Sequence, residues 1–104
     1  GGEGDHPEPF TLFLASLGTC AGIYTKSFCD QRGIPTDEIT LTQEQSFDPA
    51  KRIIGRFTLT IHVPSDFPEK YEKALIQTAS LCAVKKHLRE DIDVEVKVER
   101  KQAL

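Results

Sequence analysis

The strongest constraint on this chain is a long uncharged segment near its start. Residues 10–24 contain no acidic, basic or histidine side chain. Pro9 suits the first turn of a helix, and Gly33 followed by Pro35 marks a helix end. The segment predicts a helix from Pro9 to Arg32 that other parts of the protein surround, because a surface helix would carry charge on its outer face.

Two strands are predicted after this helix. Threonines are frequent in residues 38–47, and residues 56–63 alternate between apolar and polar side chains. A turn at residues 48–51 would join them into an antiparallel hairpin with one buried face, and Gly55 predicts a bulge.

A second helical pattern begins at Pro68, with Asp66 as its expected N-cap. Its apolar stripe at helical spacing consists of Tyr71, Ala74, Leu75, Thr78, Ala79 and Cys82. Cys82 is therefore expected to face inward, whereas the pattern leaves open whether the helix continues beyond it. Residues 92–98 alternate in the manner of a half-exposed strand.

These elements predict an α+β fold in a single domain covering residues 1–104. Three strands and one further helix are too few to cover a helix that is apolar all round. We therefore expect that strands preceding Gly1 are absent from this chain, that a second subunit covers the helix, or both. The glycine-rich residues 1–5 are typical of a loop entered from an upstream segment, or of an expression scar.

Composition argues against several classes of function. The net charge of −3 disfavours a nucleic acid partner. No apolar run approaches the roughly 20 residues of a membrane span, and no signal segment is recognisable, so we expect a cytoplasmic protein with no membrane partner. The sequence predicts no cofactor, and it lacks the closely spaced ligand pairs of a zinc site.

The three cysteines predict a reduced thiol protein rather than a secreted disulfide scaffold. Cys20 and Cys29 are nine residues apart, which at about 100° per residue places them on opposite faces of a helix. Cys20 lies in the apolar segment and Cys29 in the more polar last turns. Cys20 is the candidate reactive thiol, although a free cysteine is often only a small buried hydrophobe. Its activation is expected from an Arg, Lys or His on another element.

The glycines beside Cys20 also call for an explanation. Gly18 and Gly22 each cost roughly 1 kcal/mol relative to alanine inside a helix. Either another helix approaches closely across Ala15, Gly18 and Gly22, or the glycines leave room for a substrate beside the thiol. The two explanations are compatible.

The remaining polar candidates are expected to lie outside the functional site. His6, His62 and His87 are expected on solvated surfaces, because His62 alternates onto the polar face of its strand and His87 lies in a charged run. The Ser16 hydroxyl is expected to bond to its own helix rather than to the thiol.

Two motifs carry a family resemblance. Residues 13–21 read FLASLGTCA, and residues 79–88 read ASLCAVKKHL. With these motifs in this order, and with its helix–hairpin–helix–strand pattern from about Pro7 to Val98, the chain resembles a divergent member of the OsmC/Ohr family of thiol-dependent peroxide-detoxifying proteins. The resemblance implies an intertwined homodimer, in which the central apolar helix packs on an antiparallel sheet, and a role in the stress response.

The resemblance also implies a mechanism. The Cys20 thiolate would attack an organic hydroperoxide and become a sulfenic acid, and Cys82 would condense with it to a disulfide that an external dithiol reduces. An apolar lining from Phe10, Phe13, Leu17 and Tyr24 would favour alkyl or lipid peroxides.

This chain departs from the family pattern at three places. The family polarises its thiolate with an arginine from an early strand. The arginines of this chain do not match that place: they are Arg32, Arg52, Arg56, Arg89 and Arg100. The family often has a glutamate nine or ten residues before the first cysteine, where this chain has Thr11 and Phe10, with Glu8 nearby. Ala83 stands where the family often has proline.

Two alternative functions remain beside a peroxidase with a Cys20/Cys82 redox pair. The chain is compatible with a non-catalytic protein of the same fold that binds a small molecule or senses redox state. A thiol oxidoreductase acting on protein disulfides is disfavoured, because no two cysteines are closely spaced.

Overall fold

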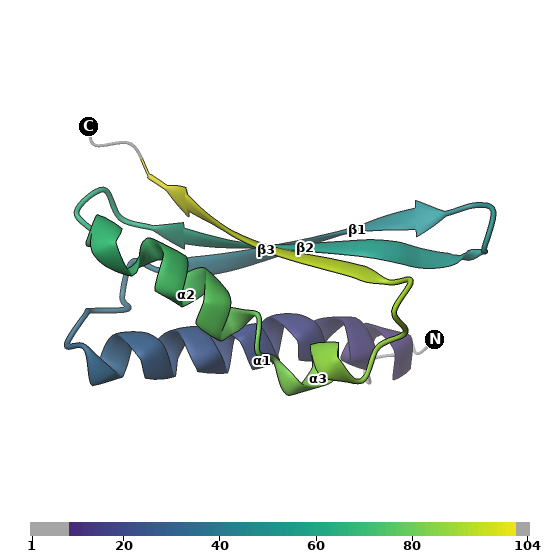
Figure 1. The fold of residues 1–104 in the computed structure, drawn as a ribbon, viewed down its shortest axis with the longest axis horizontal. Coiled ribbons are helices and arrows are strands. Elements are labelled where there is room, and N and C mark those ends of the chain that lie inside the picture. Colours follow the sequence, from purple (N-terminus) through teal and green to yellow (C-terminus); the bar gives the residue numbers. More distant parts are fainter. Residues whose placement is uncertain (1–8, 102–104) are drawn as a thin grey trace, which may run out of the picture.

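The computed structural model describes residues 9–101, which form a sheet with helices covering one of its faces (Figure 1). In chain order, the elements are α1 (Pro9–Gln31), β1 (Thr40–Asp48), β2 (Ile53–Val63), the short 3-10 helix η1 (Glu69–Tyr71), α2 (Glu72–Ala79), α3 (Ala83–Lys86) and β3 (Asp93–Arg100). The predicted α+β class is confirmed. The expectations for the glycine-rich start, His6 and Glu8 lie outside the described residues.

The sheet is mixed, which corrects the expectation of a wholly antiparallel sheet. Its strand order is β1-β2-β3. β1 and β2 form the predicted antiparallel hairpin, whereas β3 pairs with β2 in parallel, with Val96 beside Leu59. Parallel neighbours need a crossover connection. Here η1, α2 and α3 supply it by carrying the chain back across the helical face (Figure 1).

The hairpin turn contains a strained residue. The predicted bulge at Gly55 is confirmed, because Ser46 pairs with Arg56 while Phe47 pairs with Ile54. The turn closes where the Arg52 N–H donates to the Asp48 carbonyl at 2.8 Å. Arg52 has a φ of 60°, a left-handed conformation that costs a residue with a Cβ roughly 1–2 kcal/mol.

Replacing Arg52 with glycine is expected to raise the free energy of unfolding by about 0.5–1 kcal/mol, because glycine adopts positive φ without strain. Urea denaturation would measure the change. Arg52→Ala is the matched control, since it removes the same side chain but keeps the strained Cβ, and it should change stability little. Equal stability of the two variants would contradict the assignment of strain.

The core lies between β2 and the helices. Four alternating side chains of β2 are at most 1% exposed: Phe57, Leu59, Ile61 and Val63. They face Leu17, Ala21 and Phe28 of α1 and Leu75 and Ala79 of α2, which are at most 3% exposed. The alternate side chains of β2 and the helically spaced apolar side chains of α1 and α2 therefore pack together in one apolar layer.

The described residues 9–101 cover only one face of α1, in agreement with the expectation that three strands and one further helix are too few to surround it. The helix has the predicted extent to within one residue, and one face of it is buried. Three apolar side chains on its other faces remain more than half exposed: Phe10, Leu12 and Ile23. Within residues 9–101, no helix combines the length and apolarity needed to cross a membrane.

The second helix is interrupted, which answers the question that the sequence left open. It begins as η1 after Pro68, with no side-chain cap, so the expected Asp66 cap is wrong. It then continues as α2 and ends at Ala79. Cys82 lies in the break with φ −47° and ψ 127°, and α3 starts at the next residue. The extended backbone at Cys82 separates the two helices.

Candidate functional site

The structure brings Cys20 and Cys82 together. Cys20 is half-buried near the middle of α1, whereas Cys82, in the break between α2 and α3, is 1% exposed. Both are free thiols, and each shifts the pKa of the other through a hydrogen-bond interaction between their side chains. The expected inward orientation of Cys82 is confirmed, although Cys82 lies outside the helix that was expected to carry it.

The surroundings of Cys20 favour its thiolate. Burial raises the pKa of Cys20, but the hydrogen bonds from the Cys82 thiol and from the backbone N–H groups of Val84 and Ala83 together outweigh burial and lower the pKa below its usual value. Hydrogen bonds to the charged form stabilise that form. The thiolate is thus stabilised by one thiol and two backbone donors.

Cys82 has the opposite tendency. Burial raises the pKa of Cys82, and the hydrogen bond that it donates to Cys20 raises it further, against smaller effects of the Lys85 and Val84 N–H groups. The pair therefore consists of one thiol whose pKa is lowered and one whose pKa is raised. This asymmetry is what a nucleophile and its resolving partner require.

The N–H groups of Ala83 and Val84 are functional groups that sequence reasoning missed. Activation was expected from an Arg, Lys or His side chain, and the groups that act on Cys20 come instead from the start of α3. One signal was available in the sequence. A proline after Cys82 has no N–H to donate, whereas Ala83 has one.

Replacing Ala83 with proline is expected to raise the pKa of Cys20, so that its alkylation by iodoacetamide accelerates only at higher pH. The backbone tolerates proline, because Ala83 is the first residue of α3 and Cys82 before it is extended. Peptide-resolved mass spectrometry across a pH series would measure the midpoint. Ala83→Ser keeps the N–H and should match the parent, and an unshifted midpoint in the proline variant would contradict the role of this donor.

Cys29 belongs to the core rather than to the site. It lies in the last turns of α1, as expected, but is fully buried in the cluster around Phe28 and Leu75. Its neighbours in sequence are polar, but its side chain faces the sheet and α2. Burial raises the pKa of Cys29, so this thiol is poorly suited to nucleophilic chemistry.

The arginines serve other parts of the fold. Arg32 stacks on the Phe28 ring at 3.6 Å from its centroid. Arg56 pairs with Asp93 at 3.1 Å, and Arg100 donates to the Phe67 carbonyl at 2.6 Å. Arg52 and Arg89 lie at a cavity beside the hairpin. None of these side chains is among the groups that shift the pKa of Cys20.

The two glycines beside Cys20 have different surroundings. A Cβ at Gly18 would lie 3.0 Å from Oε1 of Gln43, whose Nε2 donates to the Leu14 carbonyl at 2.9 Å. A strand side chain, not a helix or a substrate space, therefore explains Gly18. A Cβ at Gly22 would meet nothing within 4 Å among the described residues.

The four residues that were expected to form one apolar lining lie at different places in the structure. An open hollow beside the thiol pair is lined by Phe13, Ala83, Val84, His87 and Leu88, and two of these residues supply the N–H donors to Cys20. Phe10 and Phe13 line the larger cavity. Leu17 is fully buried in the core, and Tyr24 borders a different hollow, so neither joins Phe10 at the cavity.

The other polar candidates have structural partners. The Ser16 hydroxyl donates to the Phe13 carbonyl at 2.6 Å, as predicted. His62 shares a 2.8 Å hydrogen bond with Thr42, and His87 is exposed with its Nδ1 2.7 Å from the Ala83 carbonyl oxygen. In the part of the chain that the structure describes, no group of three potential metal ligands occurs.

The fold and the thiol pair define an α+β dithiol protein, with one easily ionised cysteine on a central helix and its partner beside it. The chain belongs to the family of OsmC-like proteins, whose model matches residues 2–97. No curated protein sequence is similar enough to count as a relative.

Solved structures share the fold at low sequence identity. A Psychrobacter arcticus protein named for osmotic stress and detoxification responses has a TM-score of 0.78 at 21% identity, over 94% of this chain and 72% of that one. OsmC from Legionella pneumophila, an organic hydroperoxide resistance protein, has a TM-score of 0.66 at 23% identity, over 95% and 74%. OhrB of Bacillus subtilis, also an organic hydroperoxide resistance protein, has a TM-score of 0.62 at 22% identity, over 88% and 70%.

Proposed function

We propose that this chain is a thiol-dependent peroxidase that reduces organic hydroperoxides through Cys20 and Cys82. The observation that carries the proposal is the pairing of the two thiols, in which the Cys82 thiol and two backbone N–H groups lower the pKa of Cys20. Membership of the OsmC-like family supports it. So do the organic hydroperoxide resistance proteins among the structures of this fold.

The first step is the attack of the Cys20 thiolate on the O–O bond. The sulfur bonds to the terminal peroxide oxygen, the O–O bond breaks, and the leaving alkoxide takes a proton and departs as an alcohol. Cys20 becomes a sulfenic acid and the peroxide is reduced by two electrons. The apolar side chains of Phe13 and Leu88 in the adjoining hollow would favour an alkyl group over water.

The second step joins the two sulfurs. The Cys82 sulfur displaces hydroxide from the Cys20 sulfenic acid, and with the thiol proton this leaves as water, so that a disulfide forms. An external dithiol then reduces the disulfide by exchange and is itself oxidised to a disulfide. The cycle needs only the peroxide and this reductant, and it uses neither a metal nor an organic cofactor.

We further propose that the protein acts as a cytoplasmic homodimer. The exposed apolar side chains of α1 support a second copy on that face, because Phe10, Leu12 and Ile23 are each more than half exposed in one chain. Exposed apolar patches of this kind are typical of association surfaces. Sedimentation velocity would test the dimer by its mass.

One equivalent of cumene hydroperoxide is expected to lower the number of free thiols from three to one. The three cysteines start free, and oxidation would join Cys20 to Cys82 and leave Cys29. Thiol titration under denaturing conditions, followed by peptide mapping of the disulfide, would measure the result. Retention of three thiols, or a disulfide that includes Cys29, would refute the proposed pair.

A second candidate is a non-catalytic member of the fold that binds a small molecule or senses redox state. The observation that favours it is an apolar cavity of about 510 Å³, within the size range of ligand sites. This alternative predicts slow peroxide turnover even with a good dithiol reductant, together with ligand-dependent thermal stabilisation. Rapid turnover would exclude it as the sole function.

A further inference from the structure

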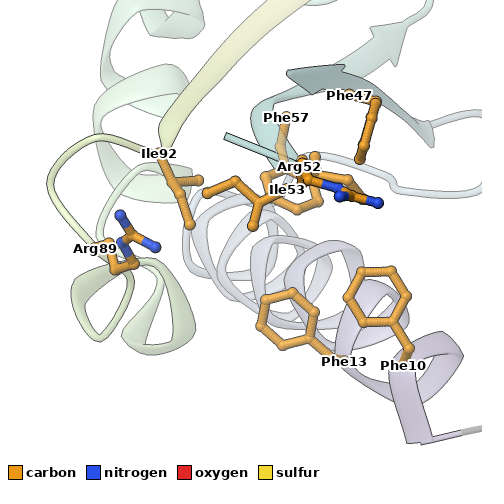
Figure 2. A pocket seen from close by; sticks show the side chains of 9 residues that line it. Phe10, Phe13, Phe47, Arg52, Ile53, Phe57, Arg89 and Ile92 are labelled. Carbon is orange, nitrogen blue, oxygen red and sulfur yellow. The ribbon is translucent and has the colours of Figure 1, made fainter. Parts of the chain in front are cut away.

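The cavity lies between the start of α1, the β1–β2 hairpin and the segment before β3. Among residues 9–101, its lining is apolar apart from two arginines and includes no acidic side chain. Figure 2 shows the aromatic rings of α1 opposite the hairpin side chains, with the two guanidinium groups at different places on the rim. The apolar side chains that the argument uses are Phe10, Phe13, Phe47, Ile53, Phe57 and Ile92.

The rim of the cavity is positively charged in a chain whose net charge is negative. Arg52 and Arg89 line it. Arg89 pairs with Asp91 at 2.8 Å, but the same carboxylate oxygen also pairs with Lys51 at 3.1 Å. Lys51 and Arg89 thus share one carboxylate partner, and Arg52 adds a further positive charge that attracts an anion.

The backbone of Arg52 gives a second, independent indication. This residue occupies the left-handed conformation at the hairpin turn, where glycine or asparagine would be less strained. Its side chain lines the cavity. Strain at such a position points to a function of the side chain, and a guanidinium at an apolar cavity is suited to a planar carboxylate.

We propose that this cavity binds an amphiphile with one hydrocarbon chain and a carboxylate head, at a site distinct from the thiol pair. The chain would lie among Phe10, Phe13 and Phe57, and the carboxylate would accept hydrogen bonds from Arg52. Binding of this ligand does not depend on either thiol. Phe13 also lines the hollow beside the thiol pair and precedes Cys20 by seven residues, about 10 Å along a helix, so the two sites adjoin at this ring.

Isothermal titration calorimetry with decanoate below its micelle concentration tests the site in the whole chain. The expected result is saturable binding of one decanoate per chain. Decanol, which has the same hydrocarbon chain without the charge, should bind at least about tenfold more weakly, because it loses the charge-assisted hydrogen bonds. Equal affinity for decanol would overturn the assignment of the carboxylate head.

Amino-acid substitutions test where the carboxylate head and the hydrocarbon chain of the ligand bind. Arg52→Gln should weaken decanoate binding about tenfold or more. Arg56→Gln, which removes an equal charge from a nearby exposed residue that does not line the cavity, should not. Phe47→Ser should also weaken binding, and it is expected to fold because Phe47 is 62% exposed. Equal effects of Arg52→Gln and Arg56→Gln would overturn the site.

Further measurements distinguish this site from the thiol pair and from an interface between two copies of the chain. Cys20→Ser should bind decanoate like the parent, so that the site stands or falls independently of the proposed peroxidase activity. Loss of binding in Cys20→Ser would place the ligand at the thiol pair and overturn the proposal. Absence of saturable decanoate binding would also overturn it. A lower sedimenting mass for Phe47→Ser in that case would assign the apolar face to a second copy of the chain.

Discussion

Replacing Cys20 with serine is expected to abolish hydroperoxide reduction, lowering kcat/KM by at least roughly a thousandfold. Serine keeps the size of the side chain, but its hydroxyl is not ionised at neutral pH, so the hydrogen bonds from Cys82, Ala83 and Val84 have no thiolate to stabilise. Peroxide consumption with cumene hydroperoxide and a dithiol reductant would measure the loss.

The matched control for this variant is Cys29→Ser. It makes the same chemical change in the same helix, but Cys29 is fully buried in the core, away from Cys82. Its activity per folded molecule should equal that of the parent, whereas its stability is expected to fall because a hydroxyl enters an apolar cluster. A Cys20→Ser variant that consumes peroxide as fast as the parent would end the peroxidase proposal.

Replacing Cys82 with serine is expected to spare the first turnover and to stop the cycle after it. The serine hydroxyl can still donate a hydrogen bond to Cys20, so the thiolate remains available for one attack. No second sulfur then lies beside Cys20 to form the disulfide, and excess peroxide should carry Cys20 from sulfenic to sulfinic acid. Steady-state turnover with a dithiol should fall by about a hundredfold or more.

Stopped-flow kinetics and intact-protein mass spectrometry would separate these two phases. A first phase of parental rate, followed by accumulation of overoxidised Cys20, is the expected result. A variant that turns over continuously would contradict the role of Cys82 as the resolving thiol. A variant with no first phase would instead show that the Cys82 thiol itself is required for activation of Cys20.

Much of the fold could be predicted from local sequence. Pro9 and Gly33 bound α1 because proline suits the start of a helix and glycine its end. The alternation after Gly55 predicted β2 because side chains on a strand point to opposite faces. Gly55 itself predicted the bulge that the strand pairing shows. Each of these features depends on a few adjacent residues.

The sequence on its own also identified Cys20 and Cys82 as the candidate pair, because helix periodicity separates Cys20 from Cys29 and the family motifs contain both thiols. Only the tertiary structure decided how the pair is arranged. It placed β3 parallel to β2, since a crossover path has no signature in the strand itself. It also showed that Ala83 and Val84 donate to Cys20. Every residue except proline carries such an N–H, so a pattern of side chains cannot reveal which of these groups faces a thiol.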